Sequence, residues 1–237
     1  MLINNIAIIL QFVKEESDNK RKNDTYKLYL KLDKMRKNLN TNDAFLYKLY
    51  ETELYEEDSF KDSCAKILRK NCQTDNFKHI KSNHYDNYRT MFDERVLQCS
   101  NICILNENKE IDENWFEVLL DTNKLILKNE KETIKINFVK ENFVTRITSA
   151  NTLLFANHSI ILIEALLQLK ALFYYSDIVF DYLDDEFLIS DIAAVLNVFS
   201  EKPFSKSTIR RRFNRMIEKK ENESSQAKVS VYCFKKF

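Results

Sequence analysis

A short segment near the C-terminus combines the residue types that read and neutralise DNA. Arginine, asparagine, serine and threonine side chains hydrogen-bond base edges in the major groove, and lysine and arginine neutralise phosphates. A helix over Lys206–Lys220 would place its apolar residues on one narrow face, namely Ile209, Phe213, Met216 and Ile217. The other faces are polar or basic. We therefore predict a DNA-contacting set made of Lys206, Ser207, Thr208, Arg210, Arg211, Arg212, Asn214 and Arg215, together with Lys228 from the segment that follows.

The residues around this segment predict a helix-turn-helix followed by a wing. Ser190 is placed to cap a helix over Asp191–Ser200, and Ser205 is placed to cap the helix that follows it. The short link between them holds the only proline, Pro203. Beyond the second helix, a charged stretch leads to alternating apolar residues, typical of a strand after a hairpin: Val229, Val231 and Cys233.

Positive charge is concentrated in the same region. Residues 201–237 hold eleven Lys or Arg and four Glu, a net charge of +7, while residues 1–200 carry −6 and the whole chain +1. A basic end on a slightly acidic body favours a polyanionic partner for that end alone. An ordinary amphipathic helix with a solvated basic face is the alternative interpretation.

The composition excludes several other chemistries. Glycine is absent from all 237 residues, where average usage of about 7% would give roughly 17. The P-loop, the GxGxxG turn and the nucleophile elbow all need glycine, so none of them is present. The five cysteines form no CxxC pair, which favours reduced, buried thiols over disulfides or a zinc site. No signal peptide or membrane-length apolar run is found, so we expect a cytoplasmic protein.

Residues 1 to about 145 have the patterns of an α+β domain. A helix is expected over Phe60–Leu68, with Asp58 or Ser59 as its cap. Asp58 and Asp62 could form a carboxylate pair, but an acidic first turn favoured by the helix dipole explains them as well. His79 and His84 are expected in a polar surface loop without a metal site. Strands are expected at Ile6–Val13, Tyr26–Leu32, Val96–Leu105, Trp115–Leu120, Lys124–Leu127 and Thr133–Phe138.

An ordered set of residues between 153 and 213 carries a family resemblance. The set comprises Asn157-His158, Tyr175, Ile178, Phe180, Phe187, Ser190-Asp191, Lys202 and Arg210-Arg211-Arg212. In this order it resembles the C-terminal half of the Nudix-related transcriptional regulators of the NrtR type, which include repressors of NAD metabolism. Fainter matches lie at Arg89, Arg95-Val96 and Trp115-Phe116. The resemblance implies a Nudix-like α/β/α sandwich domain over 1–150, followed over 151–237 by a linker helix and a winged helix-turn-helix domain.

The Nudix motif itself can be tested by its spacing. When its first glutamate is aligned with Asp58, the later motif carboxylates, which hold Mg²⁺ in Nudix hydrolases, fall on other residue types. The positions in this frame are Thr52, Asp58, Lys66, Ile67, Leu68, Lys70, Asn71 and Gln73. The resemblance therefore implies a sensor domain that is not an enzyme and has no catalytic residue, metal or cofactor.

The same resemblance implies a pocket for an effector such as ADP-ribose or another nucleotide or phosphosugar. Arg89 and Arg95 could pair with a diphosphate, because guanidinium groups match phosphate oxygens, or they could form surface salt bridges. His158 would make a structural hydrogen bond or contact the ligand. We expect a homodimeric repressor or activator that binds double-stranded DNA. The alternatives are a Nudix-type nucleotide pyrophosphohydrolase and an interaction scaffold without a sensing role.

Overall fold

The structure is a computed structural model that describes residues 2–15, 25–35, 47–89, 95–142, 144–152, 154–155, 157–200, 203–220 and 230–235. Within the strands, the side chains of residues 2, 83–89 and 95 lie outside this description. The chain divides into two compact units. Unit 1 comprises Met1–Phe12 and Leu28–Gln168, and unit 2 comprises Val13–Lys27 and Leu169–Phe237.

Unit 1 is built on a mixed sheet, for which the described residues supply nine strands. Their order is β11-β10-β9-β8-β2-β1-β7-β6, and β5 pairs with β1. β1 runs parallel to β7, and β7 runs antiparallel to β6. The strands are β1 (Leu2–Glu15), β2 (Thr25–Lys31), β5 (Tyr50–Glu53), β6 (Phe77–Arg89), β7 (Arg95–Leu105), β8 (Trp115–Leu120), β9 (Lys124–Lys128), β10 (Thr133–Glu141) and β11 (Val144–Ala150), with a separate pair β3 (Asp33–Lys34) and β4 (Tyr47–Lys48).

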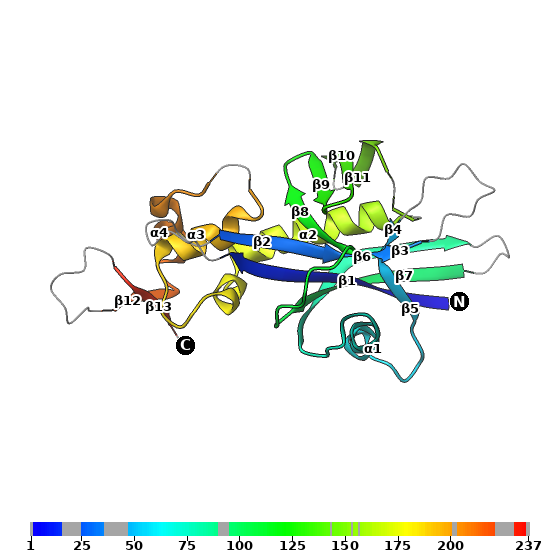
Figure 1. The fold of residues 1–237 in the computed structure, drawn as a ribbon, viewed down its shortest axis with the longest axis horizontal. Helices are drawn as coiled ribbons and strands as arrows, with labels where there is room; N and C mark the ends of the chain where they lie inside the picture. The colour runs from blue at the N-terminus through cyan, green and yellow to red at the C-terminus, as the bar shows by residue number, and fades with distance from the viewer. Residues whose placement is uncertain are drawn as a thin grey trace. The chain divides into compact units, whose positions relative to one another are not determined.

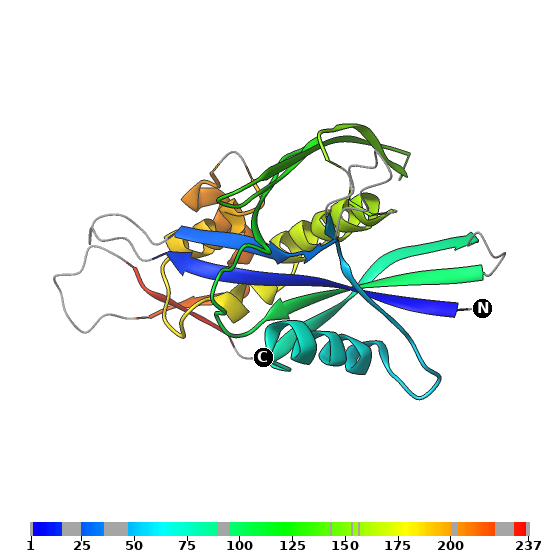
Figure 2. The same cartoon turned by 45° about the vertical axis from the view of Figure 1, so that its right-hand side comes forward.

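Helix α1 (Phe60–Cys72) covers one face of this sheet, and the unit 1 part of α2 (His158–Tyr175) lies on the other (Figures 1 and 2). The Ser59 side chain caps α1 by accepting a hydrogen bond from the Asp62 backbone N–H. The residues that α1 buries recur at helical spacing and join the core of the sheet: Cys64, Ile67, Leu68 and Cys72.

The α+β class is confirmed, and the expected strands are all present. β6 was not expected, and the prediction that His79 and His84 lie in a loop is wrong, because both belong to this strand. The sequence of β6 is polar because the strand lies at the end of the described sheet, where it pairs on one side only.

Unit 2 holds the rest of α2 and the smaller elements that follow it. These are η1 (Ile178–Tyr182), α3 (Ile189–Asn197), α4 (Lys206–Phe213), β12 (Ile217–Lys219) and β13 (Tyr232–Phe234). Aromatic rings form its core: Phe180 contacts Phe187, Phe213 and Phe234, with ring centroids 4.7–5.6 Å apart. None of the helices in the described ranges combines the length and apolar character needed to cross a membrane.

Candidate functional site

The N-terminus of α4 is fixed by a cluster of hydroxyl groups. Ser205 Oγ accepts a hydrogen bond from the Thr208 backbone N–H at 3.2 Å, which confirms Ser205 as the helix cap. The same oxygen lies 2.9 Å from Ser207 Oγ and 2.8 Å from Thr208 Oγ1. Two of the predicted DNA-contacting side chains, Ser207 and Thr208, therefore also organise the first turn of the helix.

One side of α4 is buried and the rest is cationic. Ile209 and Phe213 are each 1% exposed and anchor the helix to unit 2. At about 100° per residue, Arg211 points away from these anchors, with Arg210 and Arg212 on either side of it. All three arginines are exposed, as is Lys206.

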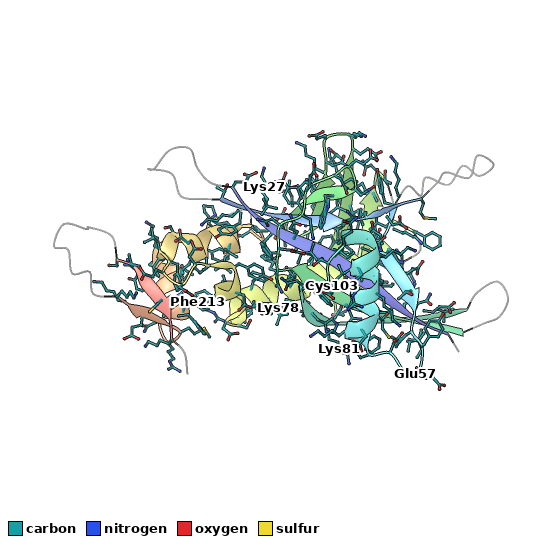
Figure 3. All side chains as sticks on the ribbon, turned by 60° about the horizontal axis from the view of Figure 1, so that its bottom comes forward. Lys27, Glu57, Lys78, Lys81, Cys103 and Phe213 are labelled. Atoms are coloured by element: carbon teal, nitrogen blue, oxygen red, sulfur yellow. The ribbon has the colours of Figure 1, made fainter. Side chains whose placement is uncertain are left out.

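Arg212 is the member of this set that is held in place by its own unit. Its Nε donates a hydrogen bond to the Tyr174 carbonyl oxygen at 2.9 Å. Its guanidinium lies 5.0 Å from the centroid of the Tyr174 ring and 4.3 Å from that of Tyr175. Figure 3 labels Phe213, the buried neighbour of Arg212, among the side chains of this unit.

The predicted helix over Lys206–Lys220 is too long. The helix ends at Phe213, so Asn214 and Arg215 lie in the turn that follows, exposed but off the helical face. Ile217 is buried as predicted, but in strand β12 rather than on a helix. The reason is long-range pairing, since Ile217 lies opposite Phe234 of β13 and Lys219 lies opposite Tyr232.

The strand expected after the hairpin is thus present as β13, while residues 221–229 between the two strands lie outside the described residues. Lys228, predicted to contact DNA, is among them. Phe187 and Tyr232 exchange two backbone hydrogen bonds, of 3.0 and 2.9 Å, and thereby tie β13 to the start of α3.

Helix α3 begins two residues earlier than predicted. The Ser190 cap is wrong, because Ser190 lies inside the helix and is buried, and Leu188 is the cap residue. Its backbone N–H donates to Asp191 Oδ2 at 2.7 Å. The link to α4 is braced where the Phe204 N–H donates to Asn197 Oδ1 at 3.0 Å.

In unit 1, α1 occupies the place of the degenerate Nudix frame. Ile67 and Leu68 are 5% and 0% exposed and belong to the core. Lys70 is exposed, and Asn71 donates from Nδ2 to the Ile67 carbonyl at 2.8 Å. Gln73 stands at the last glycine position of the motif, and it ends the helix with φ 53° and ψ 40°, in the left-handed region that glycine favours.

The carboxylates at the start of α1 are engaged within the chain. Lys66 Nζ lies 2.7 Å from both carboxylate oxygens of Asp58. Asp62 accepts a hydrogen bond from the Ser59 hydroxyl, which lowers the pKa of its carboxyl group. Across the part of the chain that the structure describes, no three His, Cys, Asp or Glu side chains are grouped to hold a metal ion.

Among the side chains that the structure describes, the residues predicted to bind an effector do not form a common site. Arg89 and Arg95 face each other at the paired backbone ends of β6 and β7, but their side chains lie outside the description. His158 is fully buried, and its Nδ1 accepts a hydrogen bond from the Leu49 N–H at 3.0 Å. Burial, with the charge of Lys48, lowers the pKa of His158 to about 4.

A pocket of about 440 Å³ lies elsewhere on unit 1, on the α1 face of the sheet. Tyr29, Glu117 and Lys128 form a row across β2, β8 and β9, because Tyr29 pairs with Glu117 and Glu117 with Lys128. Trp115 and the loop residues Ile111–Glu113 complete much of its lining. Sequence reasoning missed this pocket, since only the strand register reveals that these residues are neighbours.

Comparisons with known proteins identify the fold. No protein-family model matches the sequence, and no curated protein matches it. Among solved structures, a MutT/nudix family protein from Enterococcus faecalis is similar over 99% of this chain and 86% of its own, with a TM-score of 0.67 and 14% identity.

Two structures of Shewanella oneidensis NrtR are also similar. One, complexed with a 27mer DNA, has a TM-score of 0.53 at 12% identity and covers 98% of this chain and 93% of its own. The second NrtR structure has a TM-score of 0.51 at 12% identity and covers 99% of this chain and 94% of its own. The chain therefore has a mixed α+β fold that is similar, over almost its whole length, to Nudix-type proteins and to a Nudix-related regulator.

Proposed function

We propose that this protein is a DNA-binding transcriptional regulator whose unit 2 forms a winged helix-turn-helix. The observation that carries the proposal is the arrangement of α4. Two buried anchors hold it to the unit, a hydroxyl cluster fixes its N-terminus, and its exposed sides carry Lys206 and three consecutive arginines. Such a helix has the side chains for major-groove readout and for phosphate contacts.

The surrounding elements support this assignment. α3 precedes α4 across a short, braced link, and the β12–β13 hairpin follows it in the place of a wing. One similar solved structure is that of a regulator complexed with DNA. Among the described residues, Lys206, Arg210, Arg211 and Arg215 have no ion-pair or hydrogen-bond partner for their side chains, so their charge is available to a polyanion.

The test is selection of genomic DNA fragments by the purified chain, followed by sequencing of the bound sites. We expect enrichment of a short sequence, repeated with two-fold symmetry if the protein is a homodimer, as we propose. An Arg210→Ala, Arg211→Ala double variant should lose the enrichment, while Lys124→Ala, which removes a charge from β9 of unit 1, should keep it. Equal enrichment by the double variant would refute the assignment of α4.

The homodimer rests on this symmetry argument alone. The apolar side of α2 adds no support for a dimer, because its residues Ile161, Leu162, Leu166, Leu169 and Phe173 are all fully buried within the single chain. Light scattering at micromolar concentration should give about twice the chain mass of 28.3 kDa; a monomer would contradict the proposal.

For unit 1 we propose a sensor role without hydrolysis. The alternative, a pyrophosphohydrolase, is compatible with the similarity to a MutT/nudix protein and with the left-handed Gln73, which keeps the frame of the motif. It is disfavoured because Lys66 neutralises Asp58, and Ile67 is buried where a carboxylate would be needed.

Two measurements separate these readings of unit 1. Turnover of ADP-ribose with Mg²⁺ would favour the hydrolase. A thermal shift by ADP-ribose without turnover would favour the sensor. An Arg89→Ala, Arg95→Ala double variant, which removes the two cations predicted to pair with a diphosphate, should abolish that shift.

A further inference from the structure

The last turn of α2 carries two neighbouring tyrosines that contact α4 and the link before it. The Tyr174 ring packs against that of Phe204 in the link, with centroids 5.5 Å apart. In the last turn of α4, the Arg212 guanidinium lies 5.0 Å from the centroid of the Tyr174 ring and 4.3 Å from that of Tyr175. These residues all belong to unit 2. The end of α2 is therefore held beside the helix that we propose to enter the DNA groove.

Tyr175 is exposed although its ring is held in place. The residue is 66% exposed, and its hydroxyl has no hydrogen-bond partner among the residues that the structure describes. The Tyr174 ring meets the Tyr175 ring edge-on, with centroids 4.9 Å apart, and the Arg212 guanidinium lies over it. An exposed tyrosine with a fixed ring is suited to a contact surface, because it loses little conformational freedom when a partner binds.

Arg212 keeps hydrogen-bond donors for a second partner. Its Nε is used in the 2.9 Å bond to the Tyr174 carbonyl oxygen, one of the carbonyls left without a helical partner at the end of α2. Its two Nη groups make no hydrogen bond or ion pair within the described parts of the chain. A guanidinium can bind phosphate oxygens through two parallel N–H bonds. Arg212 is therefore a positioned cation with unused donors beside the Tyr175 ring.

The rotation of α4 determines which part of the DNA this pair would meet. At about 100° per residue, Arg211 points away from the buried side of the helix, and Arg210 and Arg212 lie on opposite flanks of it. A helix in the major groove has a sugar-phosphate backbone on either side, because the groove is only about as wide as the helix. Arg210 would therefore face one backbone, and Arg212 with Tyr175 would face the other.

We infer that Tyr175 donates a hydrogen bond from its hydroxyl to a DNA backbone phosphate, and that Arg212 and Tyr175 together form a preformed phosphate clamp on one flank of α4. The inference rests on the proposed DNA-binding function and adds to it a contact from α2, outside the two helices α3 and α4. Tyrosine hydroxyls are among the groups that position proteins on the DNA backbone without reading its sequence. Because both side chains are already held, little freedom is lost when the phosphate binds.

The experiment compares Tyr175→Phe with the unaltered chain, on the best site from the selection and on a mutated site. Phenylalanine keeps the ring beside Arg212 and removes only the hydroxyl, so the unfolding temperature should not change. We expect binding to both sites to weaken about tenfold. The dependence of log affinity on log salt should stay the same, because a neutral hydroxyl releases no counterion from DNA. Tyr55→Phe is the matched control, since Tyr55 is 64% exposed in unit 1, and it should leave DNA binding unchanged.

The possible results separate this inference from the proposed function. Equal affinity of Tyr175→Phe and the unaltered chain would overturn the inference and leave DNA binding intact. A loss confined to the best site would also overturn it, because the hydroxyl would then read a base. If the unaltered chain binds no DNA, the proposed function fails and the clamp fails with it.

A second measurement needs no variant. N-acetylimidazole acetylates accessible tyrosine hydroxyls, and mass spectrometry of the peptides locates the acetyl groups. In the free chain Tyr55 and Tyr175 should both react, since both are exposed. Saturating DNA should protect Tyr175 and leave Tyr55 reactive. Equal acetylation of Tyr175 with and without bound DNA would overturn the inference.

Discussion

Arg212 reaches back from α4 to the end of α2, where its Nε donates to the Tyr174 carbonyl at 2.9 Å. Its guanidinium also lies against the rings of Tyr174 and Tyr175. A side chain that makes these contacts keeps its charge but has a fixed position. Of the three consecutive arginines, Arg212 therefore helps to stabilise unit 2. Arg210 and Arg211 have no such contacts with described residues.

Arg212→Ala should lower the free energy of unfolding by about 1–2 kcal/mol, from one hydrogen bond and two ring contacts at an exposed site. Arg212→Lys should recover little of this, because an ammonium lacks the planar fork that satisfies the carbonyl and the rings together. Urea denaturation measures both. Arg210→Ala is the control and should change stability by less than about 0.5 kcal/mol. Equal midpoints for Arg212→Ala and Arg210→Ala would show that the contact contributes nothing.

Arg211 is expected to discriminate between bases. Its position opposite Ile209 and Phe213 aims it away from the unit, so Arg211→Ala should lose about 1–3 kcal/mol of preference for the best site over a mutated site. Fluorescence anisotropy on both DNA sequences at two salt concentrations provides the measurement.

Arg210 and Arg215 are expected to bind phosphates. Arg215 lies in the turn after α4, off the helical face. Either alanine variant should weaken binding to all sequences alike and flatten the dependence of log affinity on log salt by about one unit. A change in base preference in Arg215→Ala, without a change in salt slope, would mean that the turn enters the groove.

The sequence predicts local structure well where a local signal decides it. Ser205 caps α4 because a hydroxyl before a helix satisfies a free N–H, and no distant residue is needed for that. The end of α4 could not be predicted in this way. Met216 and Ile217 fit the helical period, and only the pairing of Ile217 with Phe234 shows that the chain turns into a strand.

The same limit applies to the sites. Tyr29 and Lys128 lie far apart in the sequence and on different strands, and only the register that pairs each of them with Glu117 makes them neighbours. The left-handed conformation of Gln73 could not be predicted from its residue type either. Left-handed backbone is unusual without glycine, and here the end of α1 requires it of a glutamine.

Unit 1 should bind divalent cations weakly. Asp58 is paired with Lys66, and Lys70 adds a second positive charge on the exposed side of the helix. A cation brought to about 4 Å from an ammonium is opposed by several kcal/mol even at an effective dielectric of about 20. Titration calorimetry with Mg²⁺ or Mn²⁺ should show no site tighter than about millimolar. A micromolar site that Asp58→Asn abolishes would reopen the hydrolase reading.

His158 should make the protein less stable in acid. Its pKa is about 4 in the folded chain, against about 6.5 for an unperturbed histidine. As the pH falls from 6.5 towards 4, His158 therefore becomes protonated in the unfolded chain but stays neutral in the folded chain. Stability falls over that window, by about 3 kcal/mol in total, since each pKa unit corresponds to about 1.4 kcal/mol.

Denaturant unfolding of the unaltered chain and of His158→Gln at pH 7, 5.5 and 4.5 isolates this contribution from that of the carboxylates. Glutamine can still accept the Leu49 N–H bond through its amide oxygen, so the variant should fold but lose this part of the pH dependence. His79→Asn is the matched control. The pKa of His79 is raised, so this histidine contributes in the opposite sense, and removing it should make the acid loss steeper. Parallel pH profiles for the unaltered chain and His158→Gln would mean that His158 titrates normally, and that the Leu49 bond opens in the folded state.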